Sequence, residues 1–305
     1  MIDTIYVAMS MDCERARDFT HPDASGPKDF AASADWVRAY AARAAEYEFP
    51  ITYFLHPEVA AGQAEVFLEL ERDGACLGLH LHPWKFGDGK YKAHFGGLSR
   101  DQQLAAVSEA SAIWQQAMGR RPDYFRPGTF SANDSTFGVL VELGFSGGSI
   151  SAPERIYPDL NSIWTGAEKD PHRPHPHFRQ WRGDLPFANL PHTHDYSTPY
   201  TLKSRRFYRD LRPDYLDADY RFIADNIVRQ VIERAPKVPM ITMDTHNDHD
   251  YTDPQDRVCG NYITMLRELN DAFERHSITP VGITMDKLCD MVLALPVDED
   301  DFVPA

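Results

Sequence analysis

One segment organises the chain: Ile5-Tyr6-Val7-Ala8-Met9-Ser10-Met11-Asp12-Cys13-Glu14, an apolar run of strand length that ends on two carboxylates. Side chains two residues apart in a strand point to the same side, so we expect Asp12 and Glu14 to face one spot where the strand stops. Cys13 lies between them and should point away. Later apolar runs also end on polar residues, which predicts that a functional site lies at the strand ends.

Apolar runs of strand length alternate with segments of helical periodicity. We expect strands at about 2–11, 51–55, 76–82, 124–125, 145–150, 185–190, 238–243 and 279–283. Between them, Ser33 is expected to cap one helix, Ser99 with Gln102 forms a capping-box signal, and Thr284 precedes the last helix. This alternation predicts an α/β fold of right-handed parallel βαβ units. About seven or eight such units favour a distorted barrel related to (β/α)8, with a doubly wound open sheet as the alternative.

Residues 152–182 interrupt this rhythm. The segment is rich in proline and contains His172, His175 and His177. A long segment without a clear period is typical of a functional loop. We therefore expect a lid-like irregular insertion within one domain that spans residues 1–305.

The composition excludes several classes of partner. The net charge of −15 argues against binding to nucleic acid or to anionic membrane surfaces. No apolar run approaches the length of an integral membrane segment, and the first residues do not resemble a signal peptide. The four cysteines lack CxxC spacing, as expected for reduced thiols. We expect a cytoplasmic protein whose partner is a small molecule or a saccharide.

The expected strand ends carry most of the residues suited to chemistry, and in α/β barrels these ends lie on one face. They are Asp12, Glu14, His56, His80, His82, Arg126, His192, His194 and His246. His80 and His82 have the spacing of two imidazoles on one side of a strand. With a carboxylate from the first strand they form the ligand pattern of a hydrolytic Zn²⁺ site, which also suits Fe²⁺, Mn²⁺ or Co²⁺. The alternative is that His80 only packs in the barrel and His82 only forms hydrogen bonds.

The two carboxylates of the first segment are expected to have different roles. One can bind the metal while the other accepts a proton from water. Arg126 would orient the catalytic carboxylate and keep it ionised. His246 is placed to protonate a leaving group. The roles of the remaining histidines stay open: His56, His94, His192, His194 and His249.

On these motifs the chain resembles the polysaccharide deacetylase family (NodB homology, carbohydrate esterase family four), over about residues 5–290. Its first motif is similar to Ser10-Met11-Asp12-Cys13-Glu14, in the Asp-x-Glu variant. The metal-histidine motif resembles Leu77-Gly78-Leu79-His80-Leu81-His82-Pro83-Trp84, and the third motif resembles Phe125-Arg126-Pro127-Gly128. Asp244-Thr245-His246 stands where the family has its Leu-His motif. The resemblance implies a distorted (β/α)7 barrel.

The resemblance also implies roles for the site residues. Asp12 would be the catalytic base, oriented by Arg126, and His246 the general acid. Glu14, His80 and His82 would bind the divalent metal. The chain departs from the family pattern in two places: Cys13 separates the acids, and Trp84 stands where the commoner motif has its second histidine. His82, His56 or His94 would then replace that ligand, or the metal is lost, as is thought for allantoinase-like relatives.

We therefore predict a metal-dependent hydrolase that removes an acetyl or formyl group from an amino sugar or a related amide. The alternatives are a metal-free amidohydrolase of a small amide and a catalytically silent carbohydrate-binding relative. Aromatic rings suit sugar faces, and the candidates for lining the cleft are Trp84, Phe86, Tyr91 and Phe130.

Overall fold

A computed structural model gives the fold of residues 2–17, 26–87 and 89–297. The central strand is β1 (Thr4–Cys13), which pairs in parallel with β2 (Ile51–Leu55), β11 (Met240–Met243) and β12 (Thr279–Gly282). The expected strand stopped at Met11, but the hydrogen-bonded ladder with β2 continues through Asp12 and Cys13. The first carboxylate is therefore held inside the ladder.

The sheet has the order β11-β1-β2-β3-β4-β5-β8, and all of its pairs are parallel. Its remaining strands are β3 (Cys76–Leu81), β4 (Tyr124–Pro127), β5 (Gly147–Gly148) and β8 (Ala188–Asn189). β8 and β11 are joined through side chains beyond β8: the backbone N–H of Thr193 donates to Thr242 Oγ1 over 2.8 Å, and that of Thr242 donates to Thr193 Oγ1 over 2.9 Å. The parallel half-barrel confirms the predicted α/β class and its distorted barrel.

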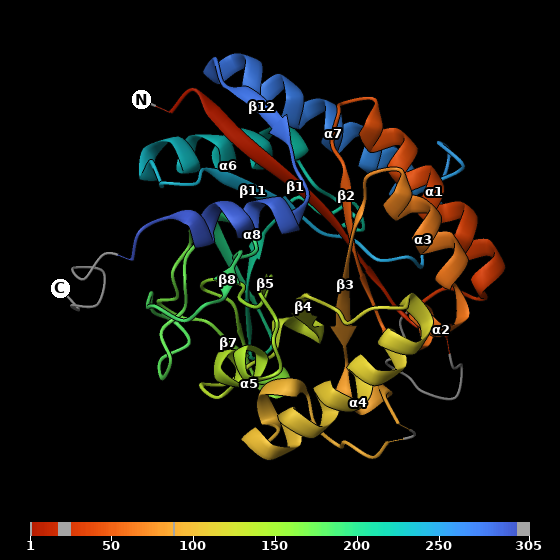
Figure 1. Ribbon diagram of the computed structural model, residues 1–305. Helices are drawn as coiled ribbons and strands as arrows, with labels where there is room; N and C mark the ends of the chain where they lie inside the picture. Colours follow the sequence, from red (N-terminus) through yellow and green to blue (C-terminus); the bar gives the residue numbers. More distant parts are fainter. Residues whose placement is uncertain (1, 18–25, 88, 298–305) are drawn as a thin grey trace.

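The helices cover the outside of this sheet (Figure 1). They are α1 (Phe30–Ala45), α2 (Pro57–Gly62), α3 (Ala64–Arg72), α4 (Arg100–Met118), α5 (Thr136–Glu142), α6 (Tyr220–Arg234), α7 (Arg257–His276) and α8 (Met285–Ala294). Short 3-10 helices are η1 (Pro83–Lys85), η2 (Phe95–Gly97), η3 (Gly128–Phe130) and η4 (Pro158–Leu160). In the described ranges, none of the helices has the length and apolarity needed to cross a membrane.

The capping signals are only partly correct. The capping box of Ser99 and Gln102 is present at the start of α4. The prediction for Ser33 is wrong, because α1 begins earlier: Asp29 Oδ1 accepts the backbone N–H of Ala32 over 2.8 Å, and Ser33 is buried within the helix. Thr284 occupies the N-cap position of α8 without forming a side-chain cap hydrogen bond.

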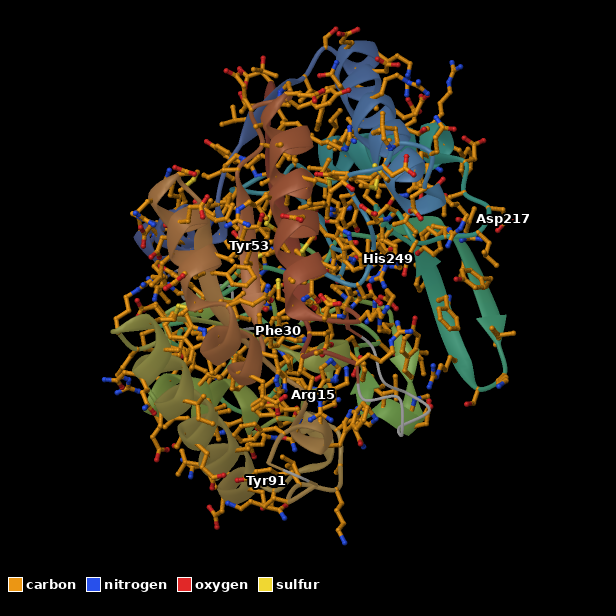
Figure 2. The ribbon with its side chains drawn as sticks, turned by 90° about the vertical axis from the view of Figure 1, so that its right-hand side faces the viewer. Arg15, Phe30, Tyr53, Tyr91, Asp217 and His249 are labelled. Carbon is orange, nitrogen blue, oxygen red and sulfur yellow. The ribbon has the colours of Figure 1, made fainter. Side chains whose placement is uncertain are left out.

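The expected irregular insertion contains regular structure. It forms β6 (Ile156–Tyr157) and β7 (Ser162–Ile163), which join a hairpin of β9 (Asp195–Leu202) and β10 (Arg205–Arg209) in an antiparallel sheet of order β7-β6-β10-β9. This hairpin is not among the strands expected from the sequence. Figure 2 shows it in teal, standing out from the barrel with Asp217 near its base. The insertion thus builds a second wall beside the barrel.

Candidate active site and metal centre

Glu14, His80 and His82 lie together at one end of the sheet, and all three are buried. Glu14 Oε1 is 2.8 Å from His82 Nε2 and 3.5 Å from His80 Nε2. The candidate ligand atoms of the group lie within 4.8 Å of one another. β2 separates β1 from β3 in the sheet, so these residues come from strands that are not neighbours. Curvature of the sheet brings their ends together.

The donor atoms of this cluster have lone pairs that other groups do not use. His80 Nδ1 lies 3.0 Å from the backbone carbonyl of Arg126, which can only accept, so the proton is on Nδ1 and Nε2 is free to bind. His80 Nε2 and Glu14 Oε1 are buried and form no hydrogen bond of good geometry in the described part of the chain, although Glu14 Oε1 lies 2.8 Å from His82 Nε2. Two imidazole nitrogens and one carboxylate oxygen therefore fit a cation such as Zn²⁺.

The electrostatics favour the protonation states of metal ligands at Glu14 and His82, whereas at His80 they favour the protonated ring. Burial raises the pKa of Glu14, but His82 and Lys85 outweigh this and hold it well below its usual value. Burial lowers the pKa of His82 to about 3, aided by Lys85 and opposed by Glu14. Burial also lowers the pKa of His80, but the carboxylates of Asp12 and Glu14 outweigh it and the pKa rises. The carboxylate is ionised and His82 is neutral, as metal binding requires.

Lys85 is a member of this centre that the sequence analysis missed. Its Nζ lies 2.9 Å from Glu14 Oε2, and its side chain is only 3% exposed. Lys85 reaches this place because η1 turns the chain directly after His82, with the Lys85 N–H donating to the His82 carbonyl over 3.0 Å. One oxygen of Glu14 is thus paired with an ammonium, while the other faces the two histidines.

The loop after β4 is shaped to accommodate His82. A Cβ added at Gly128 would lie 2.2 Å from His82 Nδ1, so any other residue there would displace the imidazole. The next two residues, Thr129 and Phe130, both have positive φ, near 58° and 53°. Such a conformation is strained for residues with a side chain and is common at functional sites.

Asp12 lies beside the cluster in a network centred on Arg126, which is fully buried. Arg126 Nη1 donates to Asp12 Oδ1 over 2.8 Å and to Asp244 Oδ1 over 3.0 Å, and Nη2 donates to Ser10 Oγ over 2.9 Å. Burial raises the pKa of Asp12, but Arg126, together with two histidines, lowers it overall. Asp12 is therefore an ionised carboxylate in a fixed orientation.

His246 joins Asp12 at the mouth of the site. The two residues form a parallel β-bridge, in which the Asp12 N–H donates to the carbonyl of Thr245 over 2.8 Å. His246 and Asp12 both line a cleft of about 710 Å³ between the barrel and the antiparallel sheet. A half-buried imidazole facing a cleft beside an ionised carboxylate is suited to proton transfer.

Other predicted candidates lie elsewhere. Phe130 lines the cleft, but Phe86 and Tyr91 are buried and stack on each other. His94 packs against Trp84, which in turn contacts the ring of His82. The group of potential ligands includes His82 and neither His56 nor His94.

His56 and Cys13 are both buried near the centre. Both nitrogens of His56 lack hydrogen-bond partners in the described ranges. Burial lowers the pKa of His56 well below its usual value, although Glu14 opposes this, so the ring is neutral. Burial raises the pKa of the Cys13 thiol, as do Asp12 and Glu14. This thiol is a poor nucleophile.

A second cluster of histidines and a carboxylate consists of His192, His194 and Asp210. His192 Nε2 lies 2.8 Å from Asp210 Oδ2, and Arg212 Nη2 lies 3.3 Å from the same oxygen. The other oxygen of Asp210 accepts the hydroxyl of Tyr215. His249 lies outside both clusters, 3.2 Å from Asp248.

Comparison with known proteins adds a family match. Residues 26–148 match the family model described as polysaccharide deacetylase. This span includes His80, His82 and Arg126, and it begins after Asp12 and Glu14. None of the curated proteins compared with the chain matches it.

Similar folds occur among solved structures. A putative polysaccharide deacetylase from Mycobacterium smegmatis is 14% identical with a TM-score of 0.58, and the match covers 97% of this chain and 93% of that one. Puue allantoinase is 13% identical with a TM-score of 0.60, covering 94% and 89%. A probable polysaccharide deacetylase from Pseudomonas aeruginosa PAO1 is 12% identical with a TM-score of 0.56, covering 94% and 90%. At these identities the likeness concerns the fold.

Proposed function

Because the chain belongs to the polysaccharide deacetylase family, we propose that it is a metal-dependent hydrolase that removes an acetyl or formyl group from the nitrogen of an amino sugar or a related amide. One observation carries this proposal. Glu14 Oε1 and His80 Nε2, which form no hydrogen bond of good geometry in the described ranges, lie together with His82 and beside the ionised Asp12. A hydrolytic centre needs this combination of a cation site and a base.

Glu14 Oε1, His80 Nε2 and His82 Nε2 would hold the metal, with Zn²⁺ as the first choice and Fe²⁺, Mn²⁺ or Co²⁺ as alternatives. A bound cation of this kind polarises an acyl oxygen and makes water more acidic. The hydrogen bond from His80 Nδ1 to the backbone holds this ring in the tautomer that binding needs.

Asp12 accepts the proton of the attacking water in this proposal. Its lowered pKa keeps it in the basic form at neutral pH, and Arg126 holds its carboxylate in place. A base that is already oriented needs no rearrangement when the water attacks the acyl carbon.

His246 donates a proton to the departing nitrogen. Its position on the same cleft as Asp12 allows an acyl group to lie between the base and the acid. Amine departure without a proton would leave an unstable anion, so a general acid is required on this side of the cleft.

The pairing of Lys85 with Glu14 favours a second candidate, a metal-free amidohydrolase of a small amide. In that reaction the ammonium group of Lys85, in place of a metal ion, supplies the fixed positive charge of the centre. Activity would then survive prolonged treatment with a chelator, whereas the metal-dependent reaction would stop.

The test is elemental analysis of the purified wild type, His80→Ala and His249→Gln, together with an assay for acetate or formate release from N-acyl amino sugars. We expect one transition metal per wild-type chain, loss of metal and activity in His80→Ala, and retention in His249→Gln, which lies outside the site. Absence of metal in the wild type after addition of Zn²⁺ or Co²⁺ would contradict the ligand set. Acyl release in the presence of chelator would favour the second candidate.

A further inference from the structure

The insertion places one arginine at the candidate active site. Arg155 immediately precedes β6, lines the cleft with Asp12 and His246, and is 8% exposed. Its guanidinium lies 4.8 Å from the ring centre of Phe130 and 4.9 Å from that of Tyr157. Its hydrogen bond is a long one, 3.4 Å from Nη1 to the Thr129 carbonyl.

Arg155 differs from the other arginines of the cleft because it has no carboxylate within ion-pair distance in the described ranges. The others are paired as follows: Arg205 with Asp159, Arg209 with Asp217, and Arg212 with Asp210 and Asp244. A buried guanidinium without a counter-ion is costly, so such a group is a candidate binding site for an anion.

The acids at the inner end of the cleft are already matched by other cations. Arg126 is paired with both Asp12 and Asp244, and Lys85 is paired with Glu14. Asp214, which lies on the segment after β10, forms no ion pair within 4.0 Å in the described ranges, and its charge acts at a distance to raise the pKa of Arg212. Among the arginines that line the cleft, Arg155 is therefore the one whose charge no carboxylate pairs in the described ranges.

The ring of Phe130 lies between this guanidinium and the network that holds Asp12. This ring contacts the guanidinium of Arg155 and also that of Arg126. Arg126 is the arginine that holds Asp12. A ligand bound to Arg155 would therefore share the cleft with Asp12, with one aromatic ring between Arg155 and the arginine that holds Asp12. The planar guanidinium matches the oxygens of a carboxylate or a phosphate group.

We propose that the substrate carries an oxyanion, a carboxylate or a phosphate, which Arg155 binds while the acyl group lies at Asp12. This inference rests on the proposed function, because it names the substrate class of the same site. A chain with a net charge of −15 repels anions at long range, so an anionic substrate requires a local cation of this kind.

The test compares charged and neutral members of matched amide pairs. The pairs are N-acetylglycine with N-acetylglycinamide, and N-acetylglucosamine 6-phosphate with N-acetylglucosamine. Binding is measured by calorimetry in the Asp12→Asn background, which prevents turnover. We expect the charged member of one pair to bind roughly ten- to a hundredfold more tightly. The pair that shows the preference identifies the anion.

Substitutions then assign the preference to Arg155. We expect Arg155→Met to reduce the ratio to near one and Arg155→Lys, which keeps the charge without the planar fork, to retain part of it. Arg206→Met is the matched control, because Arg206 is an arginine of β10 that packs on Tyr208 and does not line the cleft. It should retain the full preference.

The inference is overturned if neither pair shows a preference, or if Arg155→Met retains it as Arg206→Met does. Release of acetate by the wild type is scored separately. Hydrolysis of the neutral amides without any preference would support the proposed function and contradict this inference. A preference that depends on Arg155, without hydrolysis, would support the inference and contradict the proposed function.

Discussion

The part of the chain that the structure describes contains two clusters of the same composition, each with one carboxylate and two histidines spaced two residues apart. In the first, Glu14 Oε1 and His80 Nε2 have no hydrogen-bond partner in the described ranges, and Lys85 takes only the second oxygen of Glu14. In the second, both oxygens of Asp210 are already occupied. Both clusters are buried, so burial does not distinguish them.

The difference shows that residue type and spacing do not by themselves make a metal site. A ligand must offer a lone pair, and each oxygen of Asp210 already uses at least one to accept a hydrogen bond, so fewer lone pairs remain for a cation than on Glu14 Oε1. The second cluster therefore has a stabilising role, because the contact of His192 with Asp210 links the segment after β8 to the segment after β10. In the first cluster, Glu14 Oε1 and His80 Nε2 form no hydrogen bond of good geometry in the described ranges, so their lone pairs are available to bind a cation.

The largest expected effect separates catalysis from metal binding in the first cluster. Asp12→Asn should lower kcat by about 10²–10⁴, because the amide cannot accept the proton of the attacking water. The metal should remain, because Asp12 is not among the clustered ligand atoms. Steady-state kinetics and metal content are measured on the same samples. The control Asp248→Asn removes a carboxylate outside the site and should change kcat little. Joint loss of metal and activity would instead make Asp12 a ligand.

The next effect concerns the stability that the second cluster supplies. Asp210→Asn should lower the free energy of unfolding by about 3 kcal/mol, because it weakens a buried network and leaves Arg212 poorly matched. Metal content should stay at the wild-type value. Urea unfolding and elemental analysis check the two parts. Loss of metal in Asp210→Asn would mean that the second cluster, too, binds a cation.

The same comparison has a pH dependence. Burial raises the pKa of Asp210, but Arg212 and His192 outweigh it and hold the pKa well below its ordinary value of 3.8. A lowered folded-state pKa gives stability that is present above the unfolded value and is lost as the pH falls through the folded one. The difference between wild type and Asp210→Asn should thus be constant above about pH 5 and shrink below about pH 3.8.

Much of the fold and part of the site could be predicted because their signals are local. A few consecutive residues are enough to predict the strand β1 from its apolar run and the start of α4 from its capping box. The grouping of His80 and His82 with Glu14 followed from period-two spacing and from the convergence of strand ends in parallel sheets. The division of roles between Asp12 and Glu14 stays a prediction, as does the cytoplasmic location.

The rest depends on contacts distant in sequence. The hairpin of β9 and β10 was missed because its exposed face and polar sequence lack an apolar alternation. Asp210 follows that hairpin, so its pairing with His192 could not be seen either. No sequence motif singled out Lys85, and only the turn of η1 directs it into the centre. The spacing His82-Pro83-Trp84-Lys85 was the available signal, since proline favours such a turn.

The smallest expected effect concerns the cation that pairs with the carboxylate of each cluster, and the oxygen that this cation contacts. Lys85 pairs with Glu14 as Arg212 pairs with Asp210, but Lys85 contacts Oε2 of Glu14, while Oε1 faces the two histidines. Lys85→Met removes a positive charge beside the proposed metal site, so the affinity for Zn²⁺ or Co²⁺ should rise about tenfold or more. Competition with a chromophoric chelator measures it, and Lys90→Met, which alters an exposed pair with Glu109, is the control. Weaker binding in Lys85→Met would show the reverse: the ammonium would then serve to orient Glu14, and orientation would outweigh charge repulsion at this centre.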